Sequence, residues 1–251
     1  MRECELQSEL AASSTLICCC LGSDAALRDI VAQLAGSLLP AHGVVDLSTV
    51  SPHTAIEISQ KLGASQVEFA DAPVTGGDVG ARNGTLTIMV GASSKFFDRI
   101  SPVLGALGKK IVHLGEAGNG QKLKSINQVA VAISIIAMSE AMVMANSFGL
   151  DLRVVLDILS SGAAGSWAMT NYAPRILTGD LRPGFSAEHM LKDLRIVEKL
   201  ISDRDLELPG TALATELYAE LCARNPTRAG ELGNHALITS YPGWLDKAEM
   251  I

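Results

Sequence analysis

Short apolar runs alternate with amphipathic segments over the first half of the chain. Residues 15–21 (TLICCCL) are apolar without a break, which is typical of a strand buried on both faces of a parallel sheet. Further strands are expected at 43–48, 67–71, 85–90 and 110–114, and helices at 2–12, 25–34, after Ser51-Pro52 and at 94–107. Residues 73–84 are expected to form a long glycine-containing loop. Strands that alternate with helices predict a mostly parallel sheet.

The strand pattern stops after Gly120. One long helix rich in small residues is expected at 121–148, with Gly149 as its C-terminal cap. Further helices are expected at 152–160, 166–177, 186–203, 209–223 and 230–238. The sequence therefore predicts an α/β half and an all-helical half that meet near residue 120.

Composition narrows the possible partners and compartments. The net charge of −7 argues against a nucleic-acid surface, and no apolar run is expected to reach the length that spans a membrane. Three of the five cysteines are consecutive (18–20), and we interpret the cysteines as small buried side chains in a reducing compartment. The acidic first residues lack an apolar segment, so a targeting peptide is not expected. These observations predict a cytoplasmic protein and leave a mitochondrial or plastid location open.

The stretch 118–128 (GNGQKLKSINQ) carries the clearest candidate chemistry. Lys124, Asn127 and Gln128 fall at positions i, i+3 and i+4 of the expected helix and therefore share one face. An amine beside two amides can donate hydrogen bonds to a substrate oxygen, and a lysine of lowered pKa can also transfer a proton. The alternative is a solvated lysine near a helix start.

Polar groups also follow two of the expected strands. Thr75, Gly76 and Gly77 follow the strand at 67–71, and their hydroxyl and amide groups could hold a carboxylate or form only a turn. The hydroxyls of the segment 46–49, which ends with Thr49, could touch a ribose or phosphate, or cap the next helix. Lys192-Asp193, taken alone, predicts a surface ion pair. No metal site is expected.

The order and spacing of these stretches resemble the β-hydroxyacid dehydrogenase family over residues 15–240. The resemblance rests on Asp-Ala-Pro-Val-Thr-Gly-Gly at 71–77, Gly-Thr-Leu-Thr-Ile-Met-Val-Gly at 84–91 and the stretch 118–128. It implies an NAD(P)-dependent oxidoreductase that interconverts a small β-hydroxy acid and its semialdehyde. It further implies a homo-oligomer, for instance a dimer, formed through the helical domain.

The resemblance also implies a role for individual residues. Lys124 would be the general acid and base. The substrate would be held by Asn127, Gln128, Thr75, Gly76 and Gly77, and the cofactor by Thr49, Phe185 and Lys192. Ser166-Trp167 would line the pocket, although a tryptophan in the core is the alternative.

The sequence departs from the family in one respect. No Gly-x-Gly-x-x-Gly pattern, which binds the cofactor pyrophosphate at a helix N-terminus, occurs in the chain. The expected fold is therefore an incomplete Rossmann-like parallel sheet (1–120), with the strand at 15–21 at its edge, joined by a long helix to an all-helical substrate and dimerisation domain (121–251). NAD or NADP is expected to bind more weakly than in a complete relative. The alternative function is a catalytically impaired remnant that acts as an oligomerisation module.

Overall fold

The structure of the protein is a computed structural model in which residues 7–244 are described. The chain divides into two compact units, residues 1–124 and 125–251. The division lies within one helix, close to the boundary predicted near residue 120. The roles expected of the two halves stay predictions.

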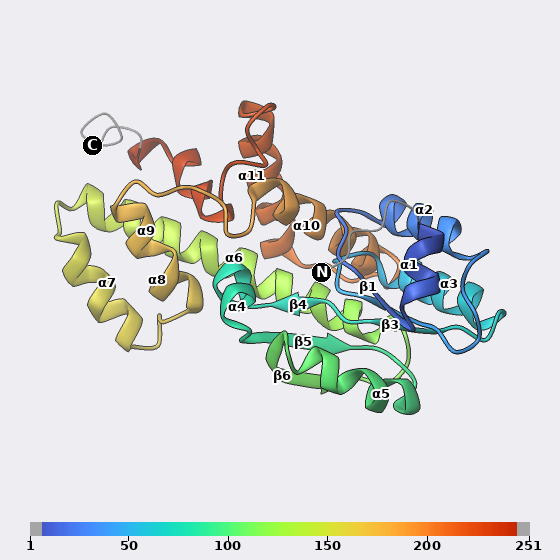
Figure 1. Cartoon of the computed structure of the whole chain (residues 1–251). Helices are drawn as coiled ribbons and strands as arrows, with labels where there is room; N and C mark the ends of the chain where they lie inside the picture. Colours follow the sequence, from blue (N-terminus) through green and yellow to red (C-terminus); the bar gives the residue numbers. More distant parts are fainter. Residues whose placement is uncertain (1–6, 245–251) are drawn as a thin grey trace. The chain divides into compact units, whose positions relative to one another are not determined.

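The first unit contains a three-stranded parallel sheet in the order β1-β2-β3 (Figure 1). Its strands are β1 (Leu16–Cys19), β2 (Gly43–Asp46) and β3 (Glu68–Asp71). The helices α1 (Gln7–Ser13), α2 (Asp24–Leu34) and α3 (Pro52–Gly63) precede or connect them. All four residues of β2 are buried, as the apolar pattern predicts for a strand with neighbours on both sides. Within the described chain β1 pairs only with β2, so it lies at the sheet edge as expected.

A second small sheet has the order β4-β5-β6. Its strands are β4 (Val74–Thr75), β5 (Leu86–Val90) and β6 (Gly108–His113), and it carries the helices α4 (Gly77–Asn83) and α5 (Ser94–Leu104). β5 and β6 are parallel, whereas β4 is antiparallel to β5. An isolated bridge between Asp71 and Gly91 connects β3 with the end of β5.

The prediction of a long loop at 73–84 is wrong, because this segment contains β4 and α4. Gly76 and Gly77 have φ angles of 127° and 65°, which turn the chain directly from strand to helix. Gly84, with φ 61°, ends the helix in the left-handed conformation. A two-residue strand and a seven-residue helix are too short to show a period in the sequence.

Serine side chains begin the connecting helices. Ser23 accepts a hydrogen bond from the Ala26 amide at the start of α2. Ser51 does the same for the Thr54 amide at the start of α3. The prediction that a hydroxyl of segment 46–49 caps this helix is therefore wrong, because Ser51 is the cap. The Ser48 hydroxyl instead accepts a hydrogen bond from the Leu21 amide.

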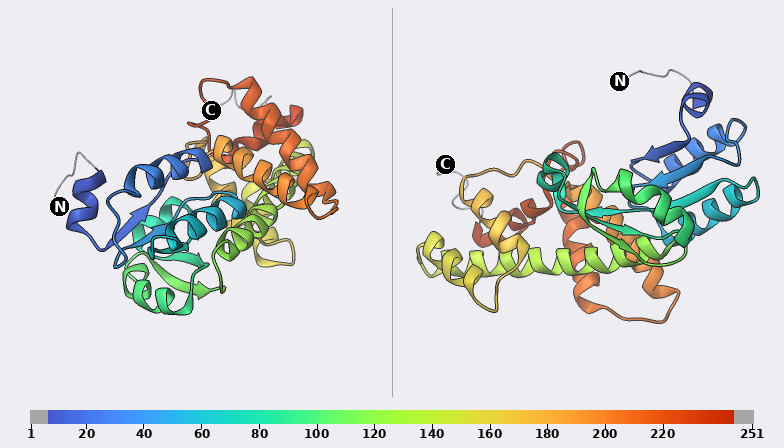
Figure 2. Two further views of the ribbon diagram at one scale, coloured as in Figure 1. Left: turned by 90° about the vertical axis from the view of Figure 1, so that its right-hand side faces the viewer. Right: turned by 60° about the horizontal axis from the view of Figure 1, so that its bottom comes forward.

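The second unit is helical. The helix α6 (Asn119–Ser147) crosses the division between the units as one unbroken ribbon (Figure 2). The remaining elements are α7 (Leu152–Ser161), α8 (Trp167–Asn171), α9 (Ala173–Leu177), α10 (Ala187–Ser202), α11 (Pro209–Arg224) and the 3-10 helix η1 (Asn234–Ser240). Gly149, with φ 68°, donates to the Asn146 carbonyl and ends α6 as predicted.

Two of the predicted helices differ in the structure. The helix expected at 166–177 is split into α8 and α9, and Pro174 lies at the start of α9, where its missing N–H cannot continue the α8 hydrogen bonds. The helix expected at 230–238 is the tighter η1, which begins after Gly233.

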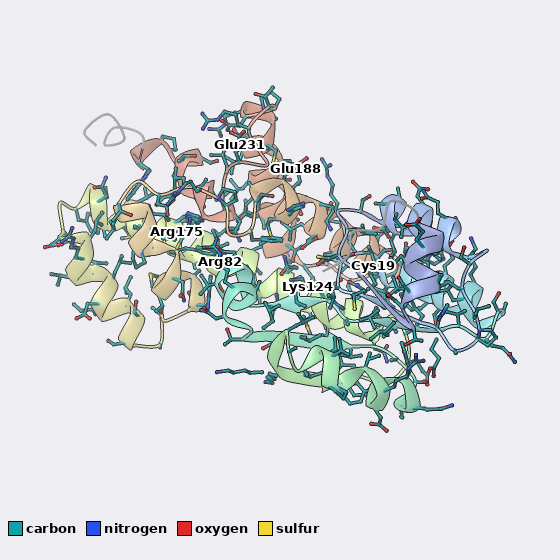
Figure 3. All side chains as sticks on the ribbon, in the orientation of Figure 1. Cys19, Arg82, Lys124, Arg175, Glu188 and Glu231 are labelled. Carbon is teal, nitrogen blue, oxygen red and sulfur yellow. The ribbon has the colours of Figure 1, made fainter. Side chains whose placement is uncertain are left out.

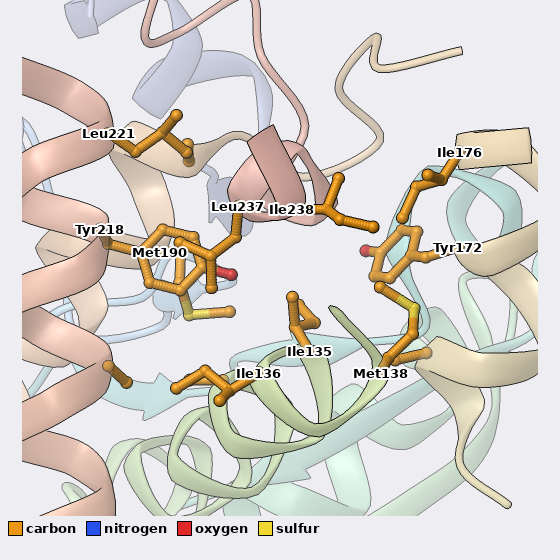
Figure 4. Close-up of a cluster of buried hydrophobic side chains, with 14 of the residues drawn as sticks. Ile135, Ile136, Met138, Tyr172, Ile176, Met190, Tyr218, Leu221, Leu237 and Ile238 are labelled. Carbon is orange, nitrogen blue, oxygen red and sulfur yellow. The ribbon is translucent and has the colours of Figure 1, made fainter. Parts of the chain in front are cut away.

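The core of the helical unit is built around α6. Ile135, Met138 and Met142 are completely buried. Figure 4 shows Ile135 and Ile136 of α6 below Leu237 and Tyr218, and Met138 of the same helix beside Tyr172. By length and composition α6 could cross a membrane, so the expectation that no apolar run reaches that length is wrong. Its buried side chains give the apolar character a different cause, since the central helix of a packed core is equally apolar.

The cysteine prediction is only partly right. Cys19 is buried, but Cys18 and Cys20 are exposed, because successive side chains of an edge strand point to opposite faces. Burial raises the pKa of Cys19 to about 12, and the nearby charges of Asp46 and the neighbouring thiols add to the effect.

Candidate active site

A buried aspartate fixes the start of α6. The Asp71 carboxylate, at the carboxyl end of β3, accepts hydrogen bonds from the amides of Gly118 (2.6 Å) and Gln121 (2.8 Å). These amides have no carbonyl partner within the helix, and a carboxylate is favoured at a helix N-terminus. Burial raises the pKa of Asp71 to about 6, although the two N–H donors act in the opposite direction.

Glycines allow the backbone to approach this carboxylate. A Cβ at Gly120 would collide with the Met89 carbonyl and lie 2.8 Å from Asp71 Oδ2, and a Cβ at Gly91 would lie 2.5 Å from Asp71 Oδ1. Gly118 has φ 92°, which a residue with a side chain rarely adopts. The Gly-Asn-Gly sequence therefore serves close packing around Asp71 as well as a tight turn.

Lys124 lies in the second turn of α6 and is only 6% exposed (Figure 3). Its Nζ donates a hydrogen bond of 2.9 Å to the carbonyl oxygen of Val74. The alternative of a solvated lysine is therefore wrong. A buried ammonium needs hydrogen-bond partners, and this bond places it beside the residue that precedes Thr75.

The predicted carboxylate-binding segment forms the turn between β4 and α4. Thr75 is half-buried in β4, opposite Thr87 of β5, and Gly77 is exposed. The positive φ angles of Gly76 and Gly77 define this turn.

Thr49 lies where the parallel strand β2 has ended, and its side chain is half-buried. Its neighbours Ser48 and Val50 are both bound by the amide side chain of Gln121. In the first unit, the first two turns of α6 therefore contact both loops that carry predicted site residues.

The remaining predicted residues belong to the helical unit. The Gln128 amide donates to Asp193 Oδ2 at 2.7 Å, and the Asn127 amide donates to Gln128 Oε1 at 2.9 Å. Lys192 forms an ion pair of 3.1 Å with Asp193 Oδ1. Asp193 is only 2% exposed, so the expected surface ion pair is wrong, because one of its partners is buried between Lys192 and Gln128.

Phe185 and Trp167 complete the predicted set. Phe185 is half-buried, one residue before Ser186, whose side chain caps α10 by accepting from the His189 amide. Trp167 is 51% exposed and packs edge-on against Tyr172, with ring centroids 4.9 Å apart. The alternative of a tryptophan in the core is therefore wrong, and its role in a pocket stays a prediction.

Sequence reasoning gave no role to Asp71 and Gln121 and placed Asp193 at the surface, although all three are buried. The first two lie within the stretches singled out above, but their partners are backbone groups distant in sequence. One signal in the sequence could have predicted the role of Asp71. It is a carboxylate at the end of an apolar strand, followed later in the chain by Gly-x-Gly at the start of a helix.

A buried ammonium at the rim of an α/β sheet, where parallel strands end, suits an enzyme that moves a hydride to and from a carbonyl carbon. Nicotinamide-dependent dehydrogenases are one class of enzyme that such an arrangement suits. Residues 2–115 match the family model described as the NAD binding domain of 6-phosphogluconate dehydrogenase. Residues 118–240 match a second family model, which is described as 'NAD-binding of NADP-dependent 3-hydroxyisobutyrate dehydrogenase'.

Individual relatives agree with these models. An uncharacterized oxidoreductase of Synechocystis is 40% identical over 92% of this chain and 79% of its own. A probable 3-hydroxyisobutyrate dehydrogenase-like protein of Arabidopsis thaliana, described as mitochondrial, is 38% identical over 78% of this chain and 57% of its own. The structure of Mycobacterium tuberculosis 3-hydroxyisobutyrate dehydrogenase with L-serine has a TM-score of 0.84 at 29% identity, covering 93% of this chain and 81% of that one.

The chain belongs to the β-hydroxyacid dehydrogenase family, and it is an oxidoreductase whose cofactor class is NAD(P). It spans between 57% and 79% of the length of the curated relatives compared with it. Thr49 follows the parallel strand β2, where open α/β sheets bind ligands, which makes it a candidate contact for the nicotinamide end of such a cofactor. The sequence contains no Gly-x-Gly-x-x-Gly turn for the pyrophosphate.

Proposed function

We propose that this chain interconverts a small β-hydroxy acid and its semialdehyde, with Lys124 as the general acid and base. The observation that carries the proposal is the hydrogen bond from the buried Lys124 ammonium to the Val74 carbonyl. It supports the role because the ammonium is held by the backbone beside Thr75 instead of being free in water.

The chemistry needs such a group. As a hydride reaches the carbonyl carbon, negative charge develops on the oxygen, and an ammonium stabilises that charge and supplies the proton. NAD(P) supplies or accepts the hydride when it is bound. In the oxidative direction the neutral amine of Lys124 takes the hydroxyl proton.

The substrate is a small molecule with a carboxylate near its carbonyl group. The Thr75 hydroxyl and the backbone N–H groups of Gly76 and Gly77 would bind the carboxylate. Asn127 and Gln128, which follow Lys124 by three and four positions on α6, would hold the substrate oxygens. Thr49, Phe185 and Lys192 would contact the cofactor.

The test is turnover by the purified chain. NADH or NADPH is mixed with tartronate semialdehyde or malonate semialdehyde, whose reduction products are β-hydroxy acids, and loss of absorbance by the reduced cofactor is followed. Reduction that Lys124→Met abolishes supports the proposal. A wild-type chain that binds cofactor but reduces no semialdehyde would overturn it and favour the non-catalytic oligomerisation module.

We further propose that two copies associate through the helical unit. Phe148, Leu150, Val154 and Ile158 are each more than half exposed at the end of α6 and on α7. Large apolar side chains grouped on consecutive segments are typical of a protein–protein interface.

A further inference from the structure

One amide side chain binds the loop after β2 at two points. Gln121 is completely buried, its Nε2 donates to the Ser48 carbonyl at 2.8 Å, and its Oε1 accepts from the Val50 amide at 3.3 Å. Ser48 and Val50 flank Thr49, so both peptide groups of Thr49 bind the same side chain. A primary amide fits this task because it offers a donor and an acceptor in one plane.

The backbone of Gln121 is fixed as well. Its N–H donates to Asp71 Oδ2 at 2.8 Å, which anchors the first turn of α6 to the end of β3. Lys124 follows Gln121 by three positions and therefore lies about one helical turn further along the same face. Gln121 thus connects the loop at Thr49 directly to the helix that carries Lys124.

We infer that Gln121 is a positioning residue that aligns the nicotinamide-side loop at Thr49 with the proton donor Lys124. This inference rests on the proposed function, because it takes Thr49 as a cofactor contact and Lys124 as the acid. Rates of hydride transfer depend steeply on such alignment, since a misplacement of about 1 Å can cost roughly 100-fold. Gln121 itself is not placed against the reacting atoms.

Two substitutions separate alignment from folding. In Gln121→Glu the side chain keeps its size and the acceptor for Val50, but a carboxylate oxygen then opposes the Ser48 carbonyl. Gln121→Met keeps similar volume and loses both hydrogen bonds. Gln60→Met, at an exposed glutamine of α3, is the matched control.

The measurements are the dissociation constant of the reduced cofactor by calorimetry, kcat and KM, and the deuterium isotope effect on kcat with cofactor deuterated at the transferred position. They are made at a temperature where circular dichroism shows each variant folded. We expect both Gln121 variants to bind cofactor about tenfold more weakly, a change of about 1.4 kcal/mol. We also expect a lower kcat and a larger isotope effect, while Gln60→Met leaves all values unchanged.

The outcomes are distinguishable. A lower melting temperature with unchanged cofactor affinity and isotope effect in the folded variants overturns the inference and leaves Gln121 a purely structural role. A wild-type chain without turnover, whose cofactor affinity still falls in the Gln121 variants, overturns the catalytic proposal but keeps Gln121 as the residue that positions Thr49. A wild-type chain that binds no cofactor overturns both. Variants that do not fold are replaced by Gln121→Asn, whose shorter amide must show the same loss of cofactor affinity.

Discussion

The ammonium of Lys124 donates to the carbonyl oxygen of Val74 across 2.9 Å, and Val74 directly precedes Thr75. The bond is made between a helix and a two-residue strand that are 50 residues apart in sequence. It gives the lysine a defined position beside the segment at Thr75. A general acid requires such a fixed geometry.

Removing the amine should therefore remove catalysis. In Lys124→Met the side chain keeps its length but has no proton to give, and we expect kcat for semialdehyde reduction to fall by roughly 100- to 10,000-fold. The measurement is steady-state oxidation of the reduced cofactor.

Lys122→Met is the matched control, because Lys122 is exposed on the same helix and its ammonium donates to the Asn119 side chain. Equal losses in the two variants would show that charge on this helix, and not the amine of Lys124, supports the rate. Circular dichroism of both variants excludes a loss of fold.

Much of the fold could be predicted because parallel strands read as short apolar runs between amphipathic segments, as at 15–21. The same run did not show that Cys18 and Cys20 are exposed, because the pattern does not distinguish an edge strand from a central one. The segment 73–84 could not, because β4 and α4 are set by the backbone angles of two glycines and not by a hydrophobic period. The site was predicted only in part. Lys124 stands out by its residue type. Asp71 does not, because its carboxylate accepts hydrogen bonds from amides 47 and 50 residues later in the sequence, and no local sequence pattern shows such a contact.

Asp71 should make stability depend on pH. Its pKa in the folded protein is raised to about 6 from 3.8, so the stability linked to it is fully present below pH 3.8 and lost as the pH rises through 6. A shift of this size corresponds to a loss on the order of 3 kcal/mol in the free energy of unfolding.

Urea unfolding of wild type and Asp71→Asn between pH 4 and 8 isolates this contribution, because asparagine does not titrate. We expect the stability of wild type relative to the variant to fall up to about pH 6 to 7 and to be constant above. A difference that is independent of pH would show that the two N–H donors offset the burial of the carboxylate.

Gly120→Ala should destabilise the first unit. The added Cβ would meet the Met89 carbonyl and the Asp71 carboxylate, which are both fixed in the core, so the cost should be about 1–3 kcal/mol or more. Gly63→Ala is the control, because no atom lies within 4 Å of its Cβ position at the end of α3. We expect this control to be neutral or stabilising by up to about 1 kcal/mol. Chemical denaturation of both variants measures the difference, and equal midpoints would contradict the close approach at Gly120.

The apolar surface of the helical unit should govern self-association. Val154 and Ile158 are 55% and 62% exposed and lie one turn apart on α7, so the double substitution Val154→Asp, Ile158→Asp places two carboxylates on one face. We expect wild type to be a dimer or larger by size-exclusion chromatography with light scattering, and the double variant to shift to monomer. Val79→Asp, at a 57% exposed position of α4 in the other unit, should leave the mass unchanged. A monomeric wild type, or a double variant that keeps the wild-type mass, would show that these side chains do not join two copies.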